Sequence, residues 1–387
     1  MNQVWRAAVA AGIAVGTLTG APEGAGAPVK EAAESVKRLS QTARLRYNRV
    51  EGLFVGYRVY VRPFPMPWGR LFTETGIGLH NRSLRWETGV DLKSDRAQGT
   101  ISLFDRTTTN DSDIISEGEN SFYSLLFKRD FKDYYRTRNG FEVSGSVDLQ
   151  RHVTASGAFS VFATRSMKVE TSWGLFYPDR VFRSNPPVTE ADGGRLDVGV
   201  EFDNRAHGPL FRNAWVVGVA YERGFRELPY NGFIASASRY QKLIFGNQAV
   251  VVRARIGSRD SRHVQHLFYL GGVSTLRGYA IKDYTGNRMA LFSAEYLFRG
   301  DVLGRVPVPG FQLLNLSLFA DTGWTDLVPS DASVLSGFSS MSPGNFKTDL
   351  GAAVGVTQEW LRFDIARRMD GTGPDNWTYL LRFMYKL

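Results

Sequence analysis

Residues 195–203 read RLDVGVEFD, and apolar side chains occupy every second position of this stretch. The apolar set is Leu196, Val198, Val200 and Phe202, and the charged set between them is Arg195, Asp197, Glu201 and Asp203. Successive side chains of a β-strand point to opposite faces, so the stretch predicts a strand with one apolar and one charged face. Such a strand suits the wall of a membrane barrel, where lipid meets one face and water the other.

The same alternation recurs along the chain, for example at 84–93, 215–221 and 292–298. Sixteen such segments are counted, from 49–61 to 376–387, and one of them covers 167–177. An even number of strands is typical of bacterial barrels. We therefore predict an all-β protein, a closed antiparallel 16-stranded transmembrane β-barrel over residues 48–387, located in the bacterial outer membrane.

Composition excludes two other classes of protein. The mean hydropathy is −0.22, and the mature region holds no apolar run long enough for a membrane helix. The net charge of +9 is dispersed rather than gathered on a basic helix, which argues against nucleic acid as a partner. A charge-lined pore and basic groups facing anionic lipid account for this charge better.

The N-terminal residues 1–27 have the pattern of a signal peptide, with Arg6, an apolar core over 7–18 and small residues at 25–27. Residues 28–47 are expected to be a short periplasmic segment, with an amphipathic helix over 31–45. No cysteine is present, which fits an exported chain without a disulfide framework.

The main departure from a plain barrel is the insert at 106–139, which the strand count places in the periplasm. It carries aromatic residues interleaved with cations, a pattern that favours a helix at the membrane interface. The aromatic residues are Phe127, Phe131, Tyr134 and Tyr135. The alternative is a small satellite fold that plugs the base of the barrel.

Three motifs follow one another in the C-terminal half: LRGY at 276–279, SAEYLF at 293–298 and FADTG at 319–323. In this order they resemble the BamA, TamA and FhaC superfamily of outer-membrane assembly and secretion barrels, the bacterial surface antigen family. The resemblance is specific over 195–387 and weaker back to residue 47. It implies protein insertion, assembly or translocation through a membrane defect and a strand seam, without bond chemistry.

Arg277 is the central candidate residue of this resemblance. The sixth extracellular loop, 259–286, is expected to fold into the lumen, where a guanidinium needs carboxylate partners. Alternation puts Glu295 and Asp321 on the luminal face, and the resemblance implies an Arg277–Asp321 pair beside Gly278 and Tyr279. The alternative is that the pair only locks the loop and supports folding.

The resemblance also implies a weak seam between the first and last strands. Candidates in the last strand are Phe383, Tyr385 and Leu387, and candidates in the first strand are Gly52 and Gly56. Glycine weakens a strand interior, which is compatible with poor pairing at that place.

Other functions stay open. Residues 28–47 are too short for the client-recruiting POTRA domains of the superfamily, so a gated or passive pore, or an anchor that docks a separate periplasmic partner through 106–139, are alternatives. The five histidines lie in no motif with a nucleophile and an acid, so no enzyme activity and no cofactor are expected. The expected partners are outer-membrane lipids and unfolded outer-membrane or secreted clients.

Overall fold

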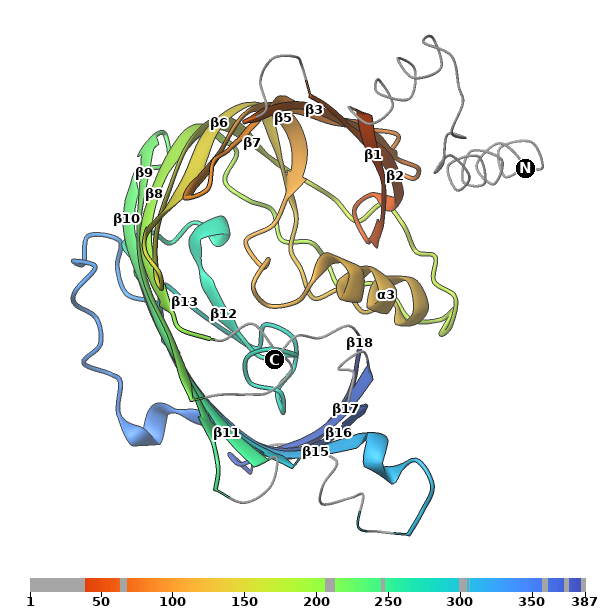
Figure 1. Ribbon diagram of the computed structural model, residues 1–387, viewed down its shortest axis with the longest axis vertical. Coiled ribbons are helices and arrows are strands. Elements are labelled where there is room, and N and C mark those ends of the chain that lie inside the picture. The colour runs from red at the N-terminus through yellow and green to blue at the C-terminus, as the bar shows by residue number, and fades with distance from the viewer. Residues whose placement is uncertain are drawn as a thin grey trace, which may run out of the picture.

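The computed structural model describes residues 39–62, 68–205, 213–244, 248–298, 305, 307–356, 361–371 and 376–383. Sixteen strands form one antiparallel sheet in chain order, and the sheet curls into a ring (Figure 1). A hairpin of two short strands, β12 and β13, and one helix, α3, lie within the connections. The all-β class and the sixteen antiparallel strands predicted from alternation are thus confirmed.

The bounds of the sheet strands are β1 Leu39–Asn48, β2 Gly52–Val61, β3 Gly69–Gly78, β4 Leu84–Lys93, β5 Ala97–Thr108, β6 Tyr135–Gln150, β7 Val153–Ser166, β8 Ala191–Asp203, β9 Ala214–Arg226, β10 Tyr230–Lys242, β11 Gln248–Arg259, β14 Arg288–Phe298, β15 Leu314–Asp326, β16 Lys347–Val356, β17 Leu361–Arg368 and β18 Trp377–Phe383. The remaining elements are α3 Glu117–Phe127, β12 Phe268–Leu270, β13 Tyr284–Gly286 and three short 3-10 helices, Val264–His266, Phe311–Leu313 and Pro343–Asn345.

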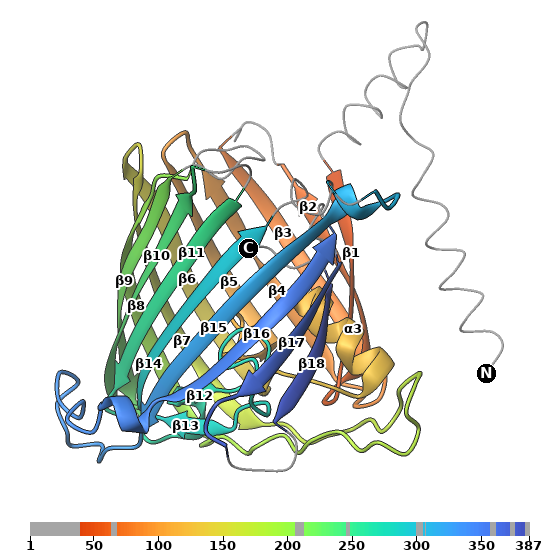
Figure 2. The same cartoon turned by 90° about the horizontal axis from the view of Figure 1, so that it is seen from below.

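The two ends of the barrel differ in their connections. One end, called the loop end here, carries long connections at 109–134, 167–190, 260–287 and 327–346. The other, called the turn end, carries short ones such as 94–96 and 151–152 (Figure 2). In bacterial outer-membrane barrels the long connections face the exterior and the short turns face the periplasm.

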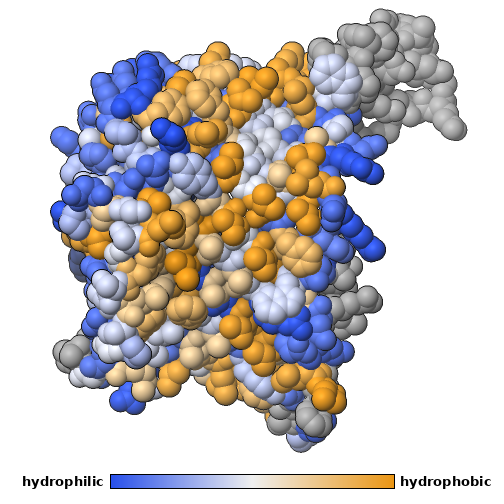
Figure 3. All heavy atoms as spheres, turned by 90° about the vertical axis from the view of Figure 1, so that its left-hand side faces the viewer, coloured by the Kyte–Doolittle hydropathy of each residue, from blue (hydrophilic) through white to orange (hydrophobic). Residues whose placement is uncertain are grey.

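The outer surface is an apolar belt, and the inner surface is polar. On β9 the outward residues Trp215, Val217 and Val219 are 44%, 39% and 57% exposed. Figure 3 shows apolar side chains spread across this side of the wall. Inward positions carry charged residues that pair with one another, such as Glu222 with Arg259 at 2.7 Å. No described helix has the length and apolar character needed to cross a membrane.

Two strand assignments from the sequence were wrong, and their errors cancel in the total. Residues 39–48 form β1 rather than the end of a periplasmic segment with a helix, because Leu45 faces outward opposite Val55 while Arg46 reaches inward to Glu51. Residues 31–38 and the signal peptide lie outside the described residues. Segment 167–177 is not a strand but part of the β7–β8 connection.

The added strand corrects the predicted position of the insert. With β1 counted, the insert between β5 and β6 is the fifth connection, so it lies at the same end as the loop that carries Arg277. Contacts agree, since Lys282 of that loop binds Asp111 and Asp133 of the insert at 2.6 Å each. The periplasmic placement of 106–139 and the extracellular placement of the Arg277 loop therefore cannot both hold, whereas docking of a separate partner stays a prediction.

The predicted closure by strand pairing is also absent from the described residues, where β1 and β18 are joined to β2 and β17 alone. Figures 1 and 2 both show α3 lying between these two edges of the sheet. A helix thus stands where a closed barrel has a strand-to-strand contact.

Val219→Arg tests the outward face at the middle of β9. Arginine facing the hydrocarbon core is expected to lower the free energy of unfolding by about 2–4 kcal/mol, measured by urea unfolding in lipid vesicles. The matched control is Ser236→Arg, whose side chain lines a luminal cavity and is expected to cost much less. Equal losses in both variants would contradict the assigned register.

Candidate functional site: a luminal charge cluster and a bracketed sheet break

The loop between β11 and β14 delivers Arg277 into the lumen. Its guanidinium makes two hydrogen bonds to Asp321 of β15, at 2.6 and 2.9 Å, in the paired geometry that favours arginine over lysine. Glu295 of β14 lies 3.5 Å away. Arg277 is 6% exposed and Asp321 1%, so the pair is shielded from water.

A second arginine extends this cluster along the wall. Arg362 of β17 bonds to Glu295 at 2.5 Å and to Asp364 at 2.7 Å. Asp364 in turn lies 3.8 Å from Arg277. Two guanidinium groups and three carboxylates from four chain segments therefore form one buried network, called the charge cluster below. Mutual pairing is what makes such burial tolerable.

The ring of Phe319 lies directly beneath the guanidinium of Arg277 in the charge cluster. The Arg277 guanidinium stacks over it at 3.4 Å, a cation–π contact. The ring lies over Gly351 of the next strand, where a Cβ atom would come within 2.2 Å of it. Glycine is thus required beside Phe319. The motif FADTG supplies both the ring, Phe319, and the carboxylate, Asp321, that contact Arg277.

Neighbouring residues of the tetrapeptide fix the loop further. The Gly278 N–H donates to Asp349 of β16 at 3.0 Å, and the Tyr279 hydroxyl donates to the carbonyl of Thr348 at 3.1 Å. Gly271 has a φ of +114° where the loop turns inward, a conformation that favours glycine. Burial disfavours the charged Arg277, but Asp321, Glu295 and Asp364 outweigh it and raise the pKa of the guanidinium.

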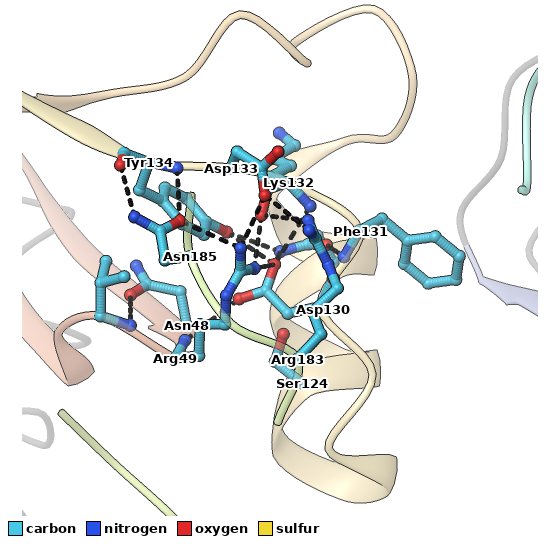
Figure 4. A network of polar contacts seen from close by, with 12 residues as sticks. Asn48, Arg49, Ser124, Asp130, Phe131, Lys132, Asp133, Tyr134, Arg183 and Asn185 are labelled. Carbon is cyan, nitrogen blue, oxygen red and sulfur yellow. Dashed lines mark hydrogen bonds and ion pairs between the residues drawn. The ribbon is translucent and has the colours of Figure 1, made fainter. Parts of the chain in front are cut away.

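A second polar network ties the loop-end connections together (Figure 4). Arg49, in the β1–β2 turn, is fully buried and bonds to the Lys132 carbonyl at 2.5 Å and to Asp133 at 2.7 Å. Asn185 of the β7–β8 connection bonds to the backbone of Tyr134 and Met167 at 2.7 Å each. The insert is therefore held from two sides.

The membrane-interface role predicted for the insert is wrong for most of its aromatic residues. Phe131 and Tyr134 are 2% and 6% exposed, and Tyr135 belongs to β6. Phe131 packs with Val273 of the Arg277 loop. The apolar spacing that predicted contact with the membrane interface therefore serves packing inside the barrel. Phe127 ends α3, half-buried. The alternative of a plugging fold describes the insert better, but at the opposite end of the barrel.

The gap between β1 and β18 is called the sheet break below. Helix α3 lies across it and bonds to both edge strands, an arrangement called the bracket below. Its Glu119 accepts from two N–H groups of Arg382 at 3.1 and 3.3 Å and from the Phe383 backbone at 3.2 Å. Its Ser121 accepts from the backbone N–H of Tyr47 in β1 at 3.1 Å. Side chains of one helix thus occupy backbone donors that a strand would otherwise pair.

The predicted seam residues divide accordingly. Gly52 and Gly56 lie in β2, which is paired on both sides, so they do not border the break; the unforeseen β1 covers that edge. Phe383 does border it, with its ring 3.9 Å from that of Phe122 in α3. Tyr385 and Leu387 lie outside the described residues.

Glu119, Ser121 and Arg49 were missed from the sequence. Each is an ordinary polar residue in a connection, and its role depends on partners far away in the chain. The S-x-x-E pattern at 116–119 does mark the start of a helix, where Ser116 accepts from the Glu119 N–H. This pattern gives no indication that Glu119 also bonds to Arg382.

Comparison with known proteins supports the fold. Residues 29–198, less than half of the chain, match the family described as "Family of unknown function (DUF5686) C-terminal domain". No curated protein matches. BamA from Haemophilus ducreyi, solved without POTRA domains 1–3, has a TM-score of 0.57 at 12% identity over 89% of this chain and 69% of its own.

Two further solved structures are CdiB from Escherichia coli, with a TM-score of 0.46 at 15% identity over 89% of this chain and 62% of its own, and OccD3 (OpdP) from Pseudomonas aeruginosa, with 0.37 at 10% over 89% of each. The apolar belt around a polar lumen is the pattern of a barrel in lipid. With a fold shared with BamA, this pattern confirms the predicted location in the bacterial outer membrane.

Arg277→Ala tests the charge cluster. Removing one partner leaves buried carboxylates without their guanidinium, so the free energy of unfolding should fall by about 3–5 kcal/mol, measured in urea. Arg205→Ala, which breaks the exposed pair with Asp203, should change it by less than about 1 kcal/mol. A loss no larger than that of the control would show that the cluster does not hold the loop.

Glu119→Ala tests the bracket. The variant removes the acceptor of three hydrogen bonds, and we expect a loss of about 1–3 kcal/mol, together with faster labelling of a cysteine introduced at Phe383. Glu117→Ala is the matched control for the β18 edge, because that side chain is 64% exposed and pairs with Arg46 of β1 at 3.5 Å rather than with β18. Similar labelling rates in both variants would contradict a bracket at this edge.

Proposed function

We propose that this outer-membrane barrel inserts or translocates polypeptides at the break between β1 and β18, with α3 as a removable cover. The observation that carries the proposal is that α3 bonds to both edge strands of the sheet break. Two sheet edges lie on either side of one helix that is attached to each by a few side-chain bonds. Breaking those bonds exposes backbone donors that an incoming strand can pair.

The sheet break can open because few bonds attach α3 to the two edge strands. Pairing within the sheet engages nearly every residue of a strand, as in the ten partners that link β1 to β2. The contacts of α3 include three hydrogen bonds to β18, and one hydrogen bond from the Tyr47 backbone and one ion pair between Glu117 and Arg46 to β1. Local opening uses the least stable region of a structure, and this edge has fewer bonds than its neighbours.

The charge cluster has a supporting role in this proposal. It fixes the Arg277 loop to β14, β15 and β17, close to β18, and Thr378 of β18 donates to the carbonyl of Gly278 at 3.1 Å. The last strand is therefore held to a rigid part of the wall while α3 moves. The sequence resemblance to assembly and secretion barrels agrees with this role.

A pore is the second candidate, and a luminal cavity favours it. The cavity measures about 720 Å³, lies toward the turn end and is lined by charged side chains that include Arg62, Arg70 and Asp91. At the loop end the insert and the Arg277 loop fill the lumen. A conducting state would require both to move, and conductance in a planar bilayer would detect it.

A disulfide between α3 and β18 tests the cover. In the double variant Phe122→Cys with Phe383→Cys, oxidation joins positions whose rings are 3.9 Å apart in a chain without native cysteine. We expect the oxidised form to lose insertion of an unfolded barrel client into proteoliposomes, and reduction to restore it.

The control is Val219→Cys with Ala235→Cys, which joins directly opposed residues of β9 and β10 away from the break. This disulfide should leave insertion intact in both redox states. Full insertion by the oxidised α3–β18 form would overturn the proposal, and an unaltered conductance in that same form would then favour the pore.

A further inference from the structure

A ridge of exposed apolar side chains lies beside α3, on the connection between β7 and β8. Trp173, Leu175, Phe176 and Tyr177 are 53%, 56%, 49% and 55% exposed, and Val181 is 83% exposed. They belong to no strand, so the apolar belt of the barrel wall does not account for them. In Figures 1 and 2 this connection passes around α3 at the open side of the ring.

The ridge is held in place although it is exposed. The backbone N–H groups of Leu175 and Phe176 donate to the carbonyls of Leu125 and Leu126, at 2.8 and 2.9 Å. These carbonyls belong to the last turn of α3, which has no further helical partners for them. The Tyr47 hydroxyl donates to the Trp173 carbonyl at 2.7 Å. The aromatic side chains are therefore presented by a fixed backbone.

Three cations gather where the ridge meets the end of α3. Lys128 donates to the Pro178 carbonyl at 2.6 Å, and Arg180 donates to the Phe127 carbonyl at 3.1 Å and lies over the Tyr177 ring at 4.9 Å. Arg129 is adjacent, and burial followed by the charge of Arg180 lowers its pKa. Within the described residues these three groups form no ion pair with a carboxylate. The C-terminal dipole of α3 offsets only part of their charge.

We propose that Arg129 and Arg180 bind the phosphate of an anionic lipid beside the buried Lys128, with the ridge from Trp173 to Tyr177 against its acyl chains. Both surfaces are needed to explain the arrangement, because a free anion would leave the ridge without a partner. The neighbouring edges already face lipid, as shown by Leu45 of β1 and Tyr379 of β18, which are 68% and 57% exposed. This inference stands apart from the proposed function.

The experiment measures lipid preference at the ridge. The single-cysteine variant Val181→Cys, labelled with a fluorophore, is reconstituted in phosphatidylcholine vesicles that contain a small fraction of brominated phosphatidylglycerol or, in parallel, of brominated phosphatidylcholine. Both leaflets have the same composition, so the orientation of the barrel does not matter. We expect stronger quenching by the anionic lipid at constant ionic strength.

Substituting the cations should remove this preference. A cation near an anionic surface contributes about fivefold in binding, so Arg129→Gln should lower the preference by about that factor and the double variant R129Q, R180Q should abolish it. The control is Arg151→Gln, an exposed cation at the turn end, which should leave it unchanged.

Four results would overturn the proposal. The first is equal quenching by both lipids, and the second is a preference that survives in the double variant. The third is a preference that inorganic phosphate abolishes at constant ionic strength, which would assign the cations to a free anion. If added unfolded polypeptide displaces the anionic lipid completely, the ridge is a client surface instead.

Discussion

The structure depends on one constraint: inside a bilayer, backbone N–H and C=O groups have no water to bond with, so every strand edge must be covered. The sheet satisfies this at fifteen strand pairings, from β1–β2 to β17–β18. At the remaining two edges α3 takes over, with Glu119 and Ser121 as acceptors. A helix can cover an edge only through side chains, so it leaves fewer bonds there than a strand would.

Charge in the lumen is the second organising feature. Arginine and acidic side chains face inward, and they connect segments that are distant in the chain, as Arg277 does with Asp321 and Arg49 does with Asp133. Two such networks hold the Arg277 loop and the insert at the loop end. They leave the lumen open toward the turn end, where the cavity of about 720 Å³ lies. The barrel therefore has one end filled by its connections and one end with a cavity.

The α3 region joins the two proposals at one place in the wall. Its N-terminal half carries the bracket residues that bind β1 and β18, and its C-terminal end carries the cations and supports the aromatic ridge. A lipid bound at the C-terminal end would contact the same helix that covers the break. Lipid composition and opening of the break are then linked through a single element, which two separate measurements address.

The sequence by itself determined the all-β class and the luminal position of Glu295 and Asp321, whereas the total of sixteen strands was right only because two errors cancelled. The class and these positions follow from alternation, which is a local property of the chain and is enforced by lipid on one face and water on the other. The sequence did not determine strand 39–48, the coil at 167–177 or the side on which the insert lies. Short segments with mixed spacing fit a helix or a strand equally well, and only pairing with a neighbour decides between them. The bracket around Glu119 likewise exists only in the folded protein, because its partners lie 263 and 264 residues further along the chain.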